Sequence, residues 1–267
     1  MYRRCFFAPL TLVLLSAALC AQTNTQLVQV IPPPMRHAEP PSPDSPPQEL
    51  EHRGDELRAQ KAYLDALDYY AAAQTKLPKS AQLWNKRGIT ELLLQRYKDA
   101  KKDFDRATHF DHNFADAYNN LGVIQYLVKK YGNAIKDYEK AIKFQPDSAS
   151  YYSNLGAAYF SRKEFEQATS AYSRAVQLDP MVLERSSHDG VAAQMSSPED
   201  RAHFEYVMAK LFAKQGDSDK SLEYLRRAME EGYKGIEDVY KDPEFERLRS
   251  DARFTQLMAS RPPAIPE

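Results

Sequence analysis

Hydrophobic residues recur with the period of an α-helix along most of the chain, in paired segments separated by short polar turns. In residues 149–161, Tyr152, Leu155, Gly156 and Tyr159 fall at positions i, i+3, i+4 and i+7, on one stripe of a helix. Residues 165–175 repeat this spacing after a polar turn, and Pro180 prevents the second helix from continuing. The pattern predicts a helix–turn–helix unit over residues 149–182.

The same unit recurs every 34 residues upstream. Five columns of residues keep this period, one of glycine, two of alanine and two of aromatic residues: Gly54, Gly88, Gly122 and Gly156; Ala66, Ala100, Ala134 and Ala168; Ala73, Ala107, Ala141 and Ala175; Tyr63, Tyr97, Tyr131 and Phe165; Tyr70, Phe104, Tyr138 and Tyr172. We expect the glycines and alanines to let the two helices of a pair approach closely. We expect the aromatic columns to fill the space between one pair and the next.

The repeated unit resembles the tetratricopeptide repeat. Its residues 152–180 read aromatic-x2-Leu-Gly-x2-Tyr, then Ala-x3-Tyr, then Pro, which is the pattern of that family. The resemblance implies an all-α fold, a right-handed superhelical solenoid of helix–turn–helix pairs. It also implies that the first helix of each pair lines a concave groove that binds peptides or partner proteins.

The repeats divide the chain into segments. Four tandem repeats are predicted over 48–182, with Ser80 as the N-cap of the second and the first as the most atypical. Residues 183–198 predict a connection, followed over 199–260 by a fifth repeat-like helix pair and short closing helices. Ser197-Pro198 is typical of a helix start. Residues 261–267 predict a loose tail.

The N-terminal segment predicts export. Residues 1–21 combine Arg3 and Arg4 with a short apolar run and small residues, as in a secretory signal peptide. The protein is therefore expected in the periplasm or outside the cell. The alternative is a lipoprotein acylated on Cys20. Residues 22–47 are rich in proline and predict a disordered linker.

Composition narrows the classes of function. The 36 Lys+Arg balance the 37 Asp+Glu, which argues against nucleic acid or an anionic membrane as the main partner. No integral membrane span is expected beyond the signal. His109 and His112 lack a convincing third ligand, and no catalytic or nucleotide-binding motif is present. We therefore expect no catalytic residues, no metal and no cofactor, and a protein that is not an enzyme.

The candidate site is the groove face of the first helices, whose residues carry little charge. The residues expected there are Asn85, Lys86, Asn119, Asn120, Tyr126, Asn154 and Phe160. Tyr126 and Phe160 are expected to be exposed and to flank the amides. In related co-chaperones a Lys, Arg and Asn clamp holds an acidic tail, and only Asn120 matches it.

The sequence therefore predicts a non-catalytic scaffold for a protein or an extended, weakly charged peptide. Two alternatives stay open. The first is a lipid-anchored assembly factor of a cell-envelope complex, and the second is an enzyme-associated regulatory subunit.

Overall fold

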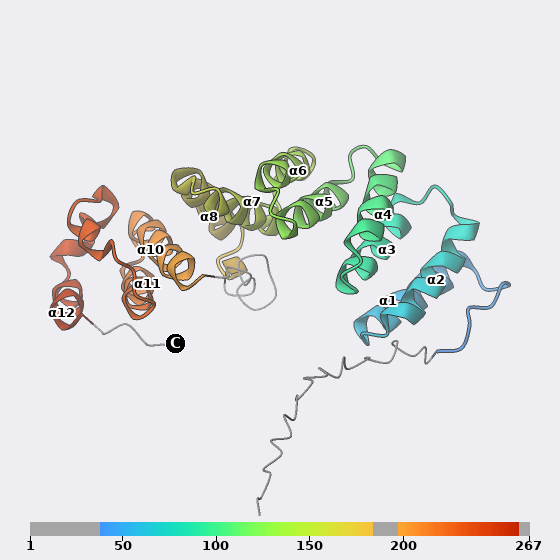
Figure 1. Cartoon of the computed structure of the whole chain (residues 1–267), viewed down its shortest axis with the longest axis horizontal. Coiled ribbons are helices and arrows are strands. Elements are labelled where there is room, and N and C mark those ends of the chain that lie inside the picture. Colours follow the sequence, from blue (N-terminus) through green and yellow to red (C-terminus); the bar gives the residue numbers. More distant parts are fainter. Residues whose placement is uncertain (1–37, 184–196, 262–267) are drawn as a thin grey trace, which may run out of the picture. The chain divides into compact units, whose positions relative to one another are not determined.

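The protein is described here by a computed structural model, which covers residues 38–183 and 197–261. The first of these ranges contains four antiparallel helix pairs, which follow one another in chain order (Figure 1). Their bounds are α1 Pro47–Ala59 and α2 Tyr63–Lys76, α3 Ala81–Leu93 and α4 Tyr97–Phe110, α5 Ala115–Leu127 and α6 Tyr131–Phe144, and α7 Ala149–Ser161 and α8 Phe165–Leu178. The predicted all-α solenoid of consecutive helix pairs is confirmed.

A fifth helix pair and a helical cap follow the connection. They comprise α10 Pro198–Gln215, α11 Ser218–Glu230, three short 3-10 helices, η2 Ile236–Tyr240, η3 Pro243–Phe245 and η4 Leu248–Ser250, and α12 Ala252–Ser260. Ser197 caps α10 by accepting a hydrogen bond from the Asp200 amide, as its sequence predicts. Gly216, in the left-handed region at φ 82°, ends α10.

Each column glycine lies beneath the aromatic ring of its own pair. A Cβ added to Gly122 would lie 2.5 Å from Cε1 and 2.6 Å from Cδ1 of Tyr138, well inside van der Waals contact. Gly54, Gly88 and Gly156 meet the rings of their own second helices in the same way. The glycine prediction is thus confirmed. The prediction for the Tyr70 to Tyr172 column needs correction, because these rings fill space inside a pair as well as between pairs.

The turn inside each of the first four pairs places a non-glycine residue in the left-handed region. Lys61, Gln95, Lys129 and Lys163 have φ of 62°, 59°, 60° and 64°. This conformation brings the Cβ of an L-residue close to the following carbonyl oxygen and costs about 1–2 kcal/mol. The fifth pair has Gly216 in the corresponding turn, where the conformation is free of that cost.

The prediction that residues 22–47 form a disordered linker is wrong for residues 38–46. This segment lies along α2, where the Ala38 amide donates to Asp65 (3.2 Å) and the Tyr69 hydroxyl donates to the Glu39 carbonyl (3.1 Å). Lys76 donates to the carbonyls of Pro43 (2.6 Å) and Ser45 (2.8 Å). A proline-rich segment cannot build a core of its own, but its carbonyls remain free to bind a neighbouring helix.

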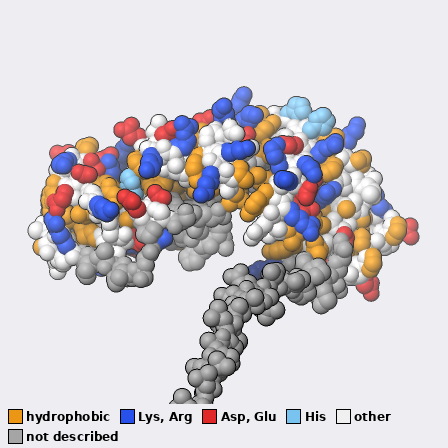
Figure 2. Space-filling model, viewed as in Figure 1, with side chains coloured by type: hydrophobic (Ala, Val, Ile, Leu, Met, Phe, Trp, Pro, Cys, Tyr) orange, Lys and Arg blue, Asp and Glu red, His pale blue; other side chains and the backbone are white. Residues whose placement is uncertain are grey.

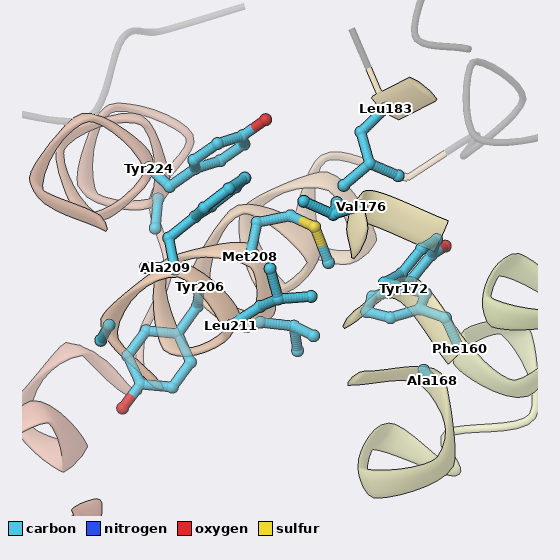
Figure 3. Packing of buried hydrophobic residues seen from close by; sticks show 14 of the residues in the cluster. Phe160, Ala168, Tyr172, Val176, Leu183, Tyr206, Met208, Ala209, Leu211 and Tyr224 are labelled. Carbon is cyan, nitrogen blue, oxygen red and sulfur yellow. The ribbon is translucent and has the colours of Figure 1, made fainter. Parts of the chain in front are cut away.

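The fourth and fifth pairs share one hydrophobic cluster. Phe160 of α7 contacts Phe165, His203 and Phe204, at ring-centroid distances of 5.3, 5.7 and 5.9 Å. Figure 3 shows Met208 and Leu211 of α10 in the same cluster as Tyr172 and Val176 of α8. The fifth pair therefore packs against the fourth, although residues 184–196 separate the two pairs in the sequence.

Several predictions concern residues outside the described ranges. These are the signal peptide 1–21 with Cys20, the linker up to residue 37, residues 184–196 of the connection, and the tail from residue 262. Within the described ranges, no helix combines the length and the apolar character that crossing a bilayer requires.

Candidate functional site

Polar contacts join the first helices of successive pairs. Five of these contacts link residues 35 positions apart: Lys86 with Glu51 (2.6 Å), Asn120 with Asn85 (3.0 Å), Asn154 with Asn119 (2.9 Å), Tyr151 with Asp116, and Ser161 with Tyr126 (3.0 Å). The interval exceeds the repeat by one residue. It therefore links positions on facing sides of neighbouring helices, and it fixes α1, α3, α5 and α7 to one another.

Four of these residues form a continuous chain of side-chain amides. Asn154 donates to Asn119, Asn119 donates to Asn120 at 3.4 Å, and Asn120 donates to Asn85. We call Asn119, Asn120 and Asn154 the amide strip; all three are half-buried. A primary amide has two N–H donors and an oxygen with two lone pairs, so every member keeps unused hydrogen-bonding capacity within these contacts.

Lys86 is held by two carboxylates and does not present a free charge. Its ammonium lies 2.6 Å from Glu51 and 2.5 Å from Asp55. Burial acts to raise the pKa of Asp55, but hydrogen bonds from Lys86 and Tyr70 outweigh it and lower that pKa. The cation is thus already compensated on the first-helix face.

Three predicted groove residues are buried instead of exposed. Asn85, Tyr126 and Phe160 have relative exposures of 6%, 6% and 4%, so the expectation of exposed flanking aromatics is wrong. Helices α3, α5 and α7 each pack against their own partner, the preceding second helix and a neighbouring first helix. A single hydrophobic stripe in the sequence reveals only part of this packing.

Two aliphatic side chains border the amides instead. Ile89 lies one turn after Asn85, and Val123 lies one turn after Asn119, so each shares a helix face with an amide. Both are half-buried against the hydrophobic core. The sequence analysis assigned this apolar contact to Tyr126 and Phe160, which the structure buries.

A hollow of about 700 Å³ lies between α8, α10 and the C-terminal cap. Its lining mixes both signs of charge: Arg174 and Lys214, and Lys210, whose ammonium lies 2.9 Å from Asp242 and 3.4 Å from Glu244. Burial lowers the pKa of His203, which also lines it. This mixture of charges favours no single class of ligand.

A buried polar cluster joins α2 of the first repeat to α3 and α4 of the second. Arg87 donates to Gln74 at 2.5 Å and lies 3.4 Å from Asp103. Burial raises the pKa of Asp103 to about 6, although Arg87 opposes the shift. Asp103 is only 4% exposed. The cluster therefore belongs to the interior and offers no accessible site.

Acidic, cysteine and histidine side chains form no metal site in residues 38–183 and 197–261, where no three of them converge. His109 and His112 lie at the end of α4, and His112 Nδ1 contacts the Thr108 carbonyl at 2.8 Å. Figure 2 shows basic and acidic groups interspersed over the face in view. This pattern matches the balanced charge of the sequence.

Comparison with known proteins identifies the repeats. Two family models, both described as tetratricopeptide repeat, match this chain: one over residues 52–113, the other over 115–148 and again over 149–181. No curated protein gave a significant match.

Solved structures with a similar chain course include a MamA protein, at 20% identity, 74% of this chain, 95% of that chain and a TM-score of 0.49. MamA 41-end from Desulfovibrio magneticus RS-1 is 18% identical, with 77% of this chain and 97% of that chain covered and a TM-score of 0.49. YrrB, described as a TPR protein with an unusual peptide-binding site, is 16% identical, with 72% of this chain and 89% of that chain covered and a TM-score of 0.46.

The family models cover the region where the structure places the helix pairs with their column glycines under aromatic rings. The chain therefore belongs to the tetratricopeptide repeat family.

Proposed function

We propose that this protein is a non-catalytic interaction scaffold that binds an extended, weakly charged protein segment on the first-helix face of its second to fourth repeats. The observation that carries the proposal is the amide strip, Asn119, Asn120 and Asn154, held by hydrogen bonds across α3, α5 and α7. Stacked repeats expose a continuous face of this kind, which suits partner binding.

The fixed positions of the amides favour binding to a peptide backbone. Their mutual hydrogen bonds restrict the rotamers, so less side-chain entropy remains to be lost when a ligand arrives. Each amide retains a free donor or acceptor that can bind the C=O or N–H group of a peptide unit, whichever side chain the ligand residue carries. Ile89 and Val123 add apolar surface along the same face.

The electrostatics favour a weakly charged ligand. Lys86 is already paired with Glu51 and Asp55, so it offers little to an acidic tail. Affinity is therefore expected to change only weakly between low and moderate salt. A strongly salt-dependent partner would point to a different surface.

A peptide selection tests the proposal. A library of displayed 12-residue peptides is selected on the full chain, and the best peptide is titrated against wild type and an Asn120→Ala/Asn154→Ala variant. The double variant is expected to lose about 1–3 kcal/mol of binding free energy, because backbone hydrogen bonds are removed. The matched control is Asn133→Ala, an exposed asparagine on α6, which should bind like wild type.

The same amides also hold neighbouring helices, so circular dichroism must show that the double variant remains folded. Equal affinity of a folded double variant and wild type would contradict binding on the amide strip. An equal loss of affinity in the Asn133→Ala variant would also contradict binding on the amide strip.

We also propose that the scaffold acts in the periplasm or outside the cell, because residues 1–21 have the pattern of a secretory signal. Intact mass of the protein recovered from its host tests this. Removal of the signal without added mass supports an exported scaffold. Lipid mass on Cys20 would instead support the envelope-anchored alternative, and an uncleaved chain would contradict export.

A further inference from the structure

A proline-rich segment of the chain itself lies along α2, with a turn at residues 43–44. Residues 38–46, which we call the strap, run along three turns of the helix in the direction of α2. The strap begins at Asp65 near the start of the helix and ends at Lys76 in its last turn. It lies on a second helix, away from the amide strip on the first helices.

The helix holds the strap through main-chain atoms. Asp65, only 3% exposed, accepts a hydrogen bond from the Ala38 amide, and Tyr69 donates to the Glu39 carbonyl. Lys76 donates to the Pro43 and Ser45 carbonyls. No strap side chain supplies any of these bonds, so they specify a backbone conformation and not a sequence of side chains.

Proline is the residue that suits such a site. Pro40, Pro41 and Pro43 have no amide N–H, so these three residues present no donor that would need an acceptor on the helix. Proline also fixes φ near the extended polyproline value, so less chain entropy is lost on docking. Ala38 packs against the hydrophobic core of the first pair, which adds an apolar anchor.

We propose that the face of α2 that carries Asp65, Tyr69 and Lys76 is a docking site for proline-rich segments, in which the strap is the resident ligand. A proline-rich segment of a partner protein competes with the strap for this face. Because the strap is tethered, its effective concentration is on the order of millimolar. A partner segment therefore binds measurably only when it is more tightly held or when the strap is loosened.

The test uses the full chain and a fluorescent synthetic peptide with the sequence of residues 36–47. A Pro40→Gly/Pro41→Gly variant loosens the strap without changing α2. It is expected to bind the peptide at least fivefold more tightly than wild type. A peptide with alanine at every proline should bind this variant at least fivefold more weakly than the natural peptide.

Anchor variants locate the site. In the loosened background, Tyr69→Phe/Lys76→Met should weaken peptide binding at least fivefold, whereas Lys79→Met, an exposed lysine beyond the helix, should leave it unchanged. Circular dichroism confirms that each variant is folded. In wild type, the Ala38 amide should be protected from hydrogen exchange, and Tyr69→Phe should reduce the protection.

Three results would overturn the proposal. They are equal peptide affinity of wild type and the loosened variant, retained affinity after loss of both anchors, and free exchange of the Ala38 amide in wild type. If the loosened variant fails to fold, the exchange measurement on wild type still decides whether the strap is docked.

Discussion

The closest test of the repeat packing is the substitution Gly122→Ala. In an exposed helix position this change stabilises by up to about 1 kcal/mol, because alanine has the better helix propensity. At Gly122 the new Cβ would lie 2.5 and 2.6 Å from two atoms of the Tyr138 ring. Contact between carbon atoms is optimal at about 3.5–4.0 Å, so the ring has to move by roughly 1 Å.

The ring has no room for such a shift. Tyr138 is fully buried in a close-packed interior, where overpacking costs about 1–3 kcal/mol. We take the upper part of this range because the overlap involves a rigid ring and not the end of a flexible chain. After the propensity gain is subtracted, the expected net destabilisation is about 2 kcal/mol.

Gly132→Ala is the matched control. Gly132 lies in the first turn of α6, and the nearest atom to an added Cβ is Nη1 of Arg162, at 3.6 Å. This is ordinary contact with a flexible side chain, so the same substitution should stabilise by up to about 1 kcal/mol. Urea unfolding followed by circular dichroism measures both variants, and their transition midpoints should move in opposite directions.

The reasoning is refuted if Gly122→Ala stabilises the protein or matches Gly132→Ala. A second background separates overlap from other causes of instability. With Tyr138→Leu, the smaller side chain leaves space for the Cβ. Gly122→Ala should then lose most of its destabilising effect, as a double-mutant cycle would show.

Three further predictions follow from single residues. Lys129→Gly should raise stability by about 1 kcal/mol, because Lys129 has a φ of 60° and glycine adopts this conformation without strain. A thermal melt checks this, and a melting temperature below that of wild type would contradict it. Tyr138→Phe should be neutral or stabilising, since the Tyr138 hydroxyl has no hydrogen-bond partner in the described part of the chain. Tyr70→Phe should instead cost about 1 kcal/mol, because it removes the 2.6 Å hydrogen bond to Asp55. A urea midpoint that is lower for Tyr138→Phe than for Tyr70→Phe would refute these hydrogen-bond assignments. Burial raises the pKa of Glu205 from 4.5 to about 7, so the folded state binds this proton more tightly than the unfolded state. The free energy of unfolding should therefore fall by roughly 1–3 kcal/mol as pH rises from 4.5 to 7. Urea titrations at several pH values should show a weaker pH dependence of stability for Glu205→Gln.

The repeat architecture was predictable because it follows from local spacing. Gly122 and Tyr138 are 16 residues apart in the same repeat, and their columns recur in phase, so the sequence alone predicts a close helix pair. The caps behave similarly. Ser80 accepts a hydrogen bond from the Leu83 amide, a contact determined by neighbouring residues.

The candidate site was less predictable, because its contacts join different repeats. The bond between Asn119 and Asn154 spans 35 residues, and a helical periodicity carries no sign of it. Phe160 has the pattern of a groove residue, but α10 returns after a long connection and covers it. Side-chain exposure on a first helix therefore depends on neighbours that a single-helix pattern does not contain.

The strap shows a third limit of sequence reasoning. Its proline-rich sequence predicts a backbone segment with no core of its own. Whether such a backbone docks depends on partners elsewhere in the chain, here Asp65, Tyr69 and Lys76. None of these residues differs in type from ordinary solvated positions of a helix.

The most direct test of the scaffold proposal is to observe the side-chain amides during binding. In a ¹⁵N-labelled full chain, the NH₂ signals of Asn119, Asn120 and Asn154 are followed by NMR while the selected peptide is added, with Asn133 as internal control. Binding on the amide strip predicts saturable shifts of the three strip signals with one common dissociation constant and an unchanged Asn133 signal. Saturable binding that leaves the three strip signals in place would contradict the proposed site.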